Sequence, residues 1–144
     1  MNTLEYGALE AGQEVSRHSY CLDTELVSNY VQSIQDENAL LCNAEGNELV
    51  PAMALAALSM RGVVEDLRIP GGTLHVGQEF EFSGAVMVGD SVNCVATLAQ
   101  NSVRGDWRFL VVECLVADEV ESEVMKGKST IMIPADLGPR EVGR

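Results

Sequence analysis

Basic residues are scarce in this sequence. Lys and Arg together number 9 against 22 Asp and Glu, which gives a formal net charge of −13 and a pI of about 4.3. No Lys or Arg lies between Arg17 and Arg61. A nucleic-acid binder needs clustered cations to replace the counterions of the phosphate backbone, and docking on an anionic membrane needs them too. We therefore expect neither nucleic acid nor a membrane as a partner, and an acidic, well-solvated surface instead.

The sequence also lacks the spacing of cysteines and histidines that holds a metal. Its four cysteines form no CxxC pair; they are Cys21, Cys42, Cys94 and Cys114. The two histidines, His18 and His75, stand at no ligand spacing from them. We expect no metal site, and we expect the thiols to be small buried groups in a reducing cytoplasm.

Long hydrophobic runs are missing as well. The longest mostly apolar run, Val50 to Met60, is far shorter than the roughly 20 residues of a membrane-spanning helix. The N-terminal stretch MNTLEYGALEAGQE places no basic residue before an apolar run, so it does not match a secretory signal. These features predict a cytoplasmic protein without a membrane segment, and the length of 144 residues predicts a single domain over residues 1–144.

Two helical patterns occupy the first half of the chain. After a short strand over residues 15–22, Asp23 or Thr24 can cap a helix that has one apolar face. Pro51 suits the start of a second helix. From residue 52 to residue 60 every residue except one serine is apolar, and four are alanines. A helix that is apolar on all sides is predicted to be buried on all sides.

The remainder of the chain alternates apolar and polar residues, which predicts an antiparallel sheet. Four strands joined by short polar turns are expected at residues 74–86, 91–100, 106–117 and 122–133. Residues 135–144 are expected to lie at the periphery. The order strand, helix, loop, helix and then four strands predicts the α+β class, with an antiparallel sheet beside a buried Ala-rich helix.

Two stretches make the sequence similar to a known family. GGTLHVGQEFEFSGAVMVGDSV, residues 71–92, resembles the segment of MaoC-like dehydratases in which an L-H-x-x-Q-E-F-x-F strand leads to G-D and the next strand. VPAM, residues 50–53, resembles the V-A-P-P that opens their central helix. The resemblance covers roughly residues 15–134 and is closest to the N-terminal-type domain of the family. It implies the hot-dog fold, an antiparallel sheet wrapped around a central buried helix.

The resemblance also implies chemistry on acyl thioesters of coenzyme A or acyl carrier protein, with no other cofactor. Catalytic members add water to an α,β-unsaturated thioester, or remove it from the R-3-hydroxy product, through the motif G-D-x-N-P-[LIV]-H. A carboxylate and an imidazole on one water can both deprotonate that water and deliver a proton to the α-carbon. Backbone N–H groups at the start of the central helix can stabilise the charge on the thioester oxygen.

In this sequence the motif becomes Q-D-E-N-A-L-L, residues 35–41, inside a polar loop predicted over residues 35–48. Asp36 and Asn38 match the carboxylate and the asparagine, while Leu41 stands where the family has histidine. A leucine cannot carry a proton, so the resemblance makes Asp36 and Asn38 candidate catalytic residues of an incomplete pair. The alternative is that both residues only cap and solvate the end of a helix.

The other candidate site residues carry weaker signals. His75 could replace the missing base, or it could make a structural hydrogen bond within its strand. Ala52, Met53 and Met60 are expected to contact the acyl thioester, although filling the core is the more ordinary use of methionine.

These observations favour a hot-dog subunit that acts on acyl thioesters as the accessory, His-lacking half of an R-specific 2-enoyl-CoA hydratase or 3-hydroxyacyl dehydratase. Its partner would be another MaoC-like chain, in a homo- or heterodimer, that carries the full Asp/His motif. Pairing would also cover an exposed sheet edge. Three alternatives stay open: a self-sufficient hydratase that uses Asp36 with His75, a non-catalytic acyl-thioester-binding or scaffold dimer, and a hot-dog thioesterase.

Overall fold

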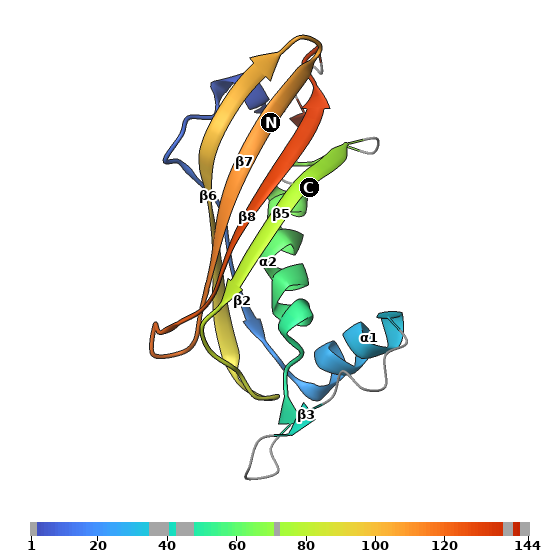
Figure 1. Ribbon diagram of the computed structural model, residues 1–144, viewed down its shortest axis with the longest axis vertical. Helices are drawn as coiled ribbons and strands as arrows, with labels where there is room; N and C mark the ends of the chain where they lie inside the picture. Colours follow the sequence, from blue (N-terminus) through green and yellow to red (C-terminus); the bar gives the residue numbers. More distant parts are fainter. Residues whose placement is uncertain (1–2, 35–40, 43–47, 71–72, 137–139, 142–144) are drawn as a thin grey trace.

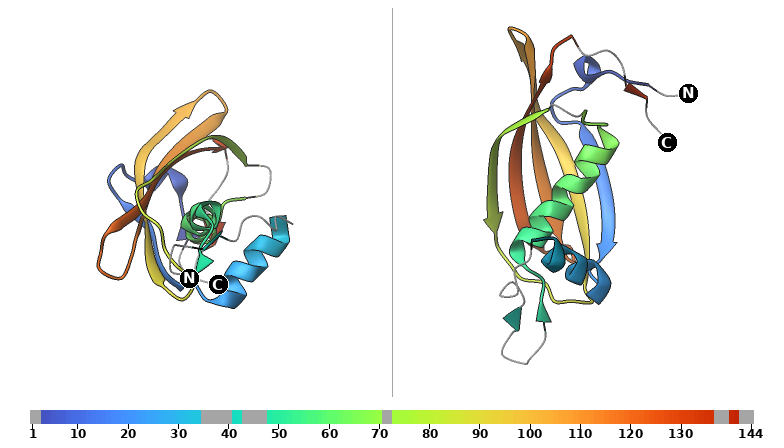
Figure 2. Two further views of the ribbon diagram at one scale, coloured as in Figure 1. Left: turned by 60° about the horizontal axis from the view of Figure 1, so that its bottom comes forward. Right: turned by 90° about the vertical axis from the view of Figure 1, so that its right-hand side faces the viewer.

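The computed structural model describes residues 3–34, 41–42, 48–70, 73–136 and 140–141. Its centre is a five-stranded antiparallel sheet in the order β2-β6-β7-β8-β5 (Figure 1). The strands are β2 (Glu14–Cys21), β5 (Leu74–Phe82), β6 (Ser91–Arg104), β7 (Trp107–Ala117) and β8 (Glu123–Pro134). The sheet curves around one side of helix α2 (Ala52–Asp66), and helix α1 (Thr24–Ile34) stands apart from the sheet (Figure 2). This architecture confirms the predicted α+β class.

Short elements tie the ends of the chain to this body. Strand β1 (Thr3–Leu4) pairs with β9 (Arg140–Glu141), and β3 (Leu41–Cys42) pairs with β4 (Glu48–Leu49). A 3-10 turn spans Tyr6–Ala8. The C-terminal tail therefore contributes a strand, which the sequence did not predict, and the two termini lie near each other (Figure 2).

The four predicted strands are present, with two changes in length. β6 continues to Arg104 because Gly105 has a φ of 61°, which permits a tight turn into β7. β5 ends at Phe82 rather than at residue 86. The reason is that Val50, just before α2, donates its backbone N–H to the carbonyl of Val86 at 2.9 Å, so the backbone at Val86 bonds to the segment before α2.

Helix α2 packs against β2, β6, β7 and β8, but it is not buried on all sides. One face is buried; it includes Leu55, Ser59 and Gly62, which follow each other at spacings of four and three. On the opposite face Met53 is 54% exposed and Val64 is 46% exposed. The prediction of burial all round is therefore wrong for this chain by itself, because the sheet covers only one side of the helix.

Two apolar clusters fill the space between α2 and the sheet. One lies toward the start of α2 and includes Val27 and Leu55; the other lies toward its end and includes Val63 and Leu98. Tyr6 closes the second cluster: it is 3% exposed, and its hydroxyl donates to the carbonyl oxygens of Leu67 and Arg68 at 2.7 and 2.8 Å. These carbonyls directly follow the last residue of α2, so Tyr6 satisfies backbone acceptors at the point where the chain leaves the helix.

Helix α1 begins as the sequence predicts. The Asp23 carboxylate accepts the backbone N–H of Leu26 at 2.8 Å, which satisfies one of the donors that a helix start leaves open. Val27 is buried, and Leu26 and Tyr30 are half-buried beside α2. Among the described residues, no helix has the length and apolar character needed to cross a membrane.

Candidate functional site

The predicted catalytic segment lies mostly outside the described residues. Asp36 and Asn38 are among the undescribed ones, so the structure does not place their carboxylate and amide. The backbone of Leu41 is placed, and it pairs with Leu49 in the β3–β4 ladder. Since Leu49 comes three residues before the first residue of α2, the end of the motif segment lies next to the start of that helix.

Three predicted residues meet in one hollow of about 330 Å³, which we call the α2–β5 cleft. Its lining comes from α1, α2 and β5: Tyr30, Met53, Ala56, Ala57, Met60, Val64, His75, Gln78 and Phe80. Met53, Met60 and Val64 share one face of α2, and His75 and Gln78 bring polar atoms from β5. Ala52 does not line the cleft; it is the exposed first residue of α2.

Met60 is held in place at the wall of this cleft. The buried hydroxyl of Ser129 donates to the Met60 sulfur at 3.2 Å, and the Cys114 thiol lies 3.8 Å from the same sulfur. Ser129 is only 1% exposed, so this contact satisfies a buried donor. A methionine side chain is ordinarily flexible, and these two contacts restrict the part of Met60 that faces the cleft.

A second hollow of about 300 Å³, the α1–α2 cleft, adjoins the first. It is lined by Leu26, Asn29, Tyr30, Ala54, Ala57, Leu58 and Arg61. Tyr30 and Ala57 line both clefts, so the two hollows are neighbours over the exposed side of α2. Arg61 supplies the one charged side chain among these lining residues. No sequence motif marks Arg61, because it is a single arginine within an apolar helix.

His18, to which the sequence assigns no role, is part of a polar contact on the other side of α2. Its Nε2 lies 2.8 Å from Oδ2 of Asp66, and the Ser16 hydroxyl donates to the same oxygen at 2.8 Å. Asp66 lies on the helix face that carries Gly62, opposite the face of Met53 and Met60. The pair therefore fastens α2 to β2 and does not enter the clefts.

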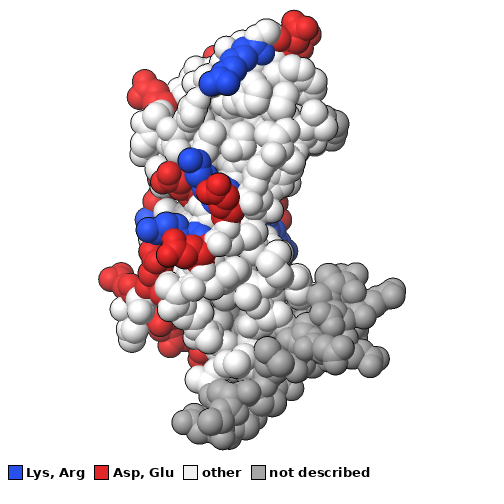
Figure 3. All heavy atoms as spheres, in the orientation of Figure 1, with Lys and Arg blue, Asp and Glu red and all other residues white. Residues whose placement is uncertain are grey.

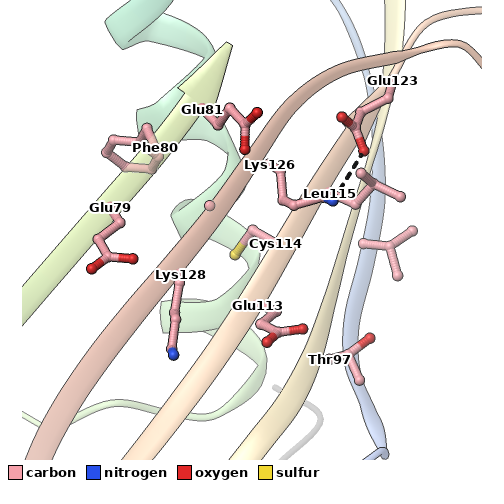
Figure 4. A pocket seen from close by; sticks show the side chains of 12 residues that line it. Glu79, Phe80, Glu81, Thr97, Glu113, Cys114, Leu115, Glu123, Lys126 and Lys128 are labelled. Carbon is pink, nitrogen blue, oxygen red and sulfur yellow. Dashed lines mark ion pairs between the residues drawn. The ribbon is translucent and has the colours of Figure 1, made fainter. Parts of the chain in front are cut away.

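A larger hollow of about 820 Å³ lies on the outer face of the sheet (Figure 4). Lys128 pairs across strands with Glu79 and with Glu113, and Figure 4 shows its side chain between those two carboxylates. Lys126 lies 3.7 Å from Glu123. Charged side chains of both signs gather across the middle of this face (Figure 3). Because opposite charges face each other across neighbouring strands and the face points away from α2, we interpret it as a solvated surface rather than an acyl site.

The three cysteines whose side chains the structure describes are not placed to act as nucleophiles in either cleft. Cys94 and Cys114 are buried and free, and burial raises the pKa of these thiols to about 12 and about 11. Both therefore stay protonated at neutral pH. Cys21 is exposed, so the expectation that the cysteines are buried is wrong at this position: its side chain points away from the helix on the edge strand β2. The described residues contain no group of three or more His, Cys, Asp or Glu that could hold a metal ion.

Comparison with known proteins adds a family and a fold. A family model described as "FAS1-like, dehydratase domain region" matches residues 10–127. No curated protein matches the sequence. The solved structure of the R-hydratase PhaJ1 from Pseudomonas aeruginosa is 18% identical with a TM-score of 0.78, over 99% of this chain and 93% of that one.

Two further structures have the same architecture. A MaoC-like dehydratase from Rhodospirillum rubrum is 15% identical with a TM-score of 0.69, over 89% of this chain and 94% of that one. The HadBC 3R-hydroxyacyl-ACP dehydratase complex from Mycobacterium tuberculosis is 18% identical with a TM-score of 0.68, over 85% of this chain and 96% of that one. These likenesses confirm the predicted hot-dog fold.

Proposed function

This chain belongs to the FAS1-like dehydratase domain family and is a MaoC-like hot-dog domain, and we propose that it is the accessory, His-lacking half of an R-specific 2-enoyl-thioester hydratase or 3-hydroxyacyl dehydratase. It contributes part of the acyl-binding cleft. A second hot-dog chain contributes the complete Asp/His pair. We propose that the reaction takes place in the cytoplasm. Its substrate would be a thioester of coenzyme A or of a carrier protein, and it would need no further cofactor.

The observation that carries this proposal is the replacement of the motif histidine by Leu41. No histidine lies between His18 and His75 in the sequence. The imidazole of His18 is bonded to Asp66 on the far side of α2, so it cannot serve the clefts. A water molecule held only by Asp36 and Asn38 lacks the second group needed to return a proton to the α-carbon.

The free edge of the sheet is evidence in favour of a partner chain. β5 is at the end of the sheet and pairs only with β8 among the described strands. Leu74, Val76 and Phe82 on this strand are 48%, 51% and 40% exposed, and they are apolar. A second hot-dog domain that paired with this edge would cover these residues, and we propose that it also covers the exposed Met53 and Val64 of α2.

The substrate's acyl group is proposed to begin in the α2–β5 cleft against Met53 and Met60 and to extend past Ala57 into the adjoining α1–α2 cleft. The thioester oxygen is proposed to meet the N–H groups of the first turn of α2, beginning at Ala52. Pro51 precedes this turn and makes no side-chain hydrogen bond to it, while its carbonyl accepts the N–H of Ala54 at 2.9 Å, so the N–H groups of Ala52 and Met53 are the proposed donors. A preorganised donor of this kind contributes about 3 kcal/mol to transition-state stabilisation in other acyl-transfer enzymes.

A self-sufficient hydratase is the second candidate, and the position of His75 favours it. His75 lines the same cleft as Met53 and Met60, where an imidazole could act with Asp36. The structure gives the His75 ring no hydrogen-bond partner among the described residues.

The deciding experiment is hydration of crotonyl-CoA and of 2-octenoyl-CoA by the purified chain, followed at the enoyl-thioester absorbance. We expect no turnover by the chain alone and turnover when a hot-dog chain with the intact motif is added. Asp36→Asn should then reduce the activity of the pair if Asp36 helps to hold water, whereas Asp136→Asn, in the exposed turn after β8, should not. Turnover by the isolated chain that is lost in both Asp36→Asn and His75→Ala would replace the accessory role by the self-sufficient one.

A further inference from the structure

The α1–α2 cleft contains a cationic side chain, Arg61, which would make no favourable contact with a purely hydrocarbon acyl chain. Five of its seven lining residues are apolar, and they are Leu26, Tyr30, Ala54, Ala57 and Leu58 in a hollow of about 300 Å³. Asn29 and Arg61 are the two polar exceptions. An apolar slot beside a guanidinium and an amide matches a ligand that is apolar along its length and anionic at its end.

The guanidinium of Arg61 has capacity left for such a ligand. Its Nε lies 3.4 Å from a Glu65 carboxylate oxygen, a long contact between side chains that are 56% and 58% exposed. Ion pairs of this kind contribute little, because both groups remain solvated. The guanidinium carbon of Arg61 also lies over the Tyr20 ring, 6.0 Å from the ring centre. An arginine carries five N–H donors, so a carboxylate could still be bound through two of them.

The position of Arg61 along α2 fits the far end of an acyl group. Arg61 comes nine positions after Ala52, and at 1.5 Å per residue this is about 14 Å along the helix axis. In the proposed function the thioester oxygen lies at the first turn of α2. Part of the remaining distance is spanned by the long arginine side chain itself. An acyl chain of six to eight carbons, roughly, would therefore place its last carbon near the guanidinium.

We propose that Arg61 and Asn29 select acyl groups that carry a carboxylate at the end remote from the thioester. This inference rests on the proposed function, because it concerns the acyl group of the same substrate. A phosphate of coenzyme A or of a carrier protein is the other source of negative charge. The apolar walls that lead to Arg61 favour the acyl carboxylate. A phosphate group would gain no binding energy from contact with the apolar side chains of Leu26, Ala54 and Leu58.

The test is binding of four pantetheine thioesters, measured by isothermal titration calorimetry. Hexanoyl- and octanoyl-pantetheine are the neutral probes, and adipoyl- and suberoyl-pantetheine carry the extra carboxylate without any phosphate. We expect the natural chain to bind the dicarboxylic probes about fivefold more tightly than the neutral ones of equal length. Arg61→Gln should abolish this preference. Arg17→Gln, on β2 and paired with Glu14, is the matched control and should not change it.

The possible failures are distinguishable. Equal binding of neutral and dicarboxylic probes, with no effect of Arg61→Gln, would overturn the role of Arg61 and leave the proposed function standing. Binding of none of the four probes, either by the chain alone or with a motif-bearing hot-dog chain added, would count against the proposed function itself. If Arg61→Gln weakens hexanoyl-CoA and adipoyl-CoA alike but leaves the pantetheine thioesters unchanged, Arg61 binds a coenzyme phosphate and the acyl assignment is wrong. Glu65→Gln removes the competing carboxylate and should increase the preference.

Discussion

Gly62 sets how closely α2 approaches the edge strand β2. A Cβ atom at this position would lie 2.6 Å from the Ser16 hydroxyl oxygen, and it would also meet the ring of His18. Real Cβ atoms do not tolerate such contacts, so the residues that bind Asp66 would have to move. The absence of a side chain at one helix residue therefore permits the His18–Asp66 and Ser16–Asp66 contacts.

Gly62→Ala should consequently destabilise the protein, although alanine is the better helix former. Overpacking costs about 1–3 kcal/mol, whereas the gain in helix propensity is about 1 kcal/mol. We expect a net loss of roughly 1 kcal/mol in the free energy of unfolding, measured by urea denaturation. Gly84→Ala is the control, since its nearest atom would lie at an ordinary 3.7 Å. An increase in stability on Gly62→Ala would show that α2 and β2 separate easily.

Single residues also mark what the sequence could not reveal. The match of residues 71–92 to a family strand predicted β5 and the turn into β6 well, because alternation and the G-D turn are local features. The role of His18 depends on Asp66, 48 residues later, and no local pattern connects the two. The position of Arg61 in a cleft likewise becomes apparent only when α1 is placed beside α2. Contacts between residues that are distant in sequence can be identified only once the packing of α2 against β2 and α1 is known.

At the scale of the element, α2 shows where composition misleads. Its run of alanines and leucines predicted a helix correctly, and its starting point next to Pro51 is confirmed. The same run predicted burial on every side, yet Met53 and Val64 are exposed. An apolar helix face can be buried in the core of its own chain or against a second chain. The sequence pattern is the same in both cases.

One pair of substitutions can distinguish the buried apolar positions of α2 from the exposed ones. Ala56 is 2% exposed, whereas its neighbour Ala57 is exposed. Ala56→Glu would bury a carboxylate without a partner and should cost more than about 4 kcal/mol, which leaves the protein unfolded or insoluble. Ala57→Glu should melt cooperatively near the natural temperature. A soluble, cooperatively melting Ala56→Glu protein would contradict the packing of α2 on the sheet.

For the whole molecule, the exposed side of α2 and the free edge of β5 form one incomplete surface. Both clefts lie along it, and His75 and Gln78 of β5 line the α2–β5 cleft. An exposed edge strand with apolar side chains is a liability in a protein that remains alone. The opposite edge differs, because on β2 the exposed Arg17 and Glu14 form an ion pair at 2.6 Å. We therefore expect association through β5.

Val76→Lys tests this expectation, with Val120→Lys as its matched control. Val76 is 51% exposed on β5, and Val120 is 82% exposed in the turn between β7 and β8. A lysine at position 76 should weaken association, with itself or with a motif-bearing hot-dog chain, by at least about tenfold in Kd, because a charge at an interface core must be desolvated. Sedimentation velocity gives both constants. Both variants should keep the natural melting behaviour when dissociated, since neither side chain is part of the core. If both lysines affect assembly equally, the β5 edge is not the contact surface, and the clefts beside α2 would have to bind a thioester without a second chain to close them.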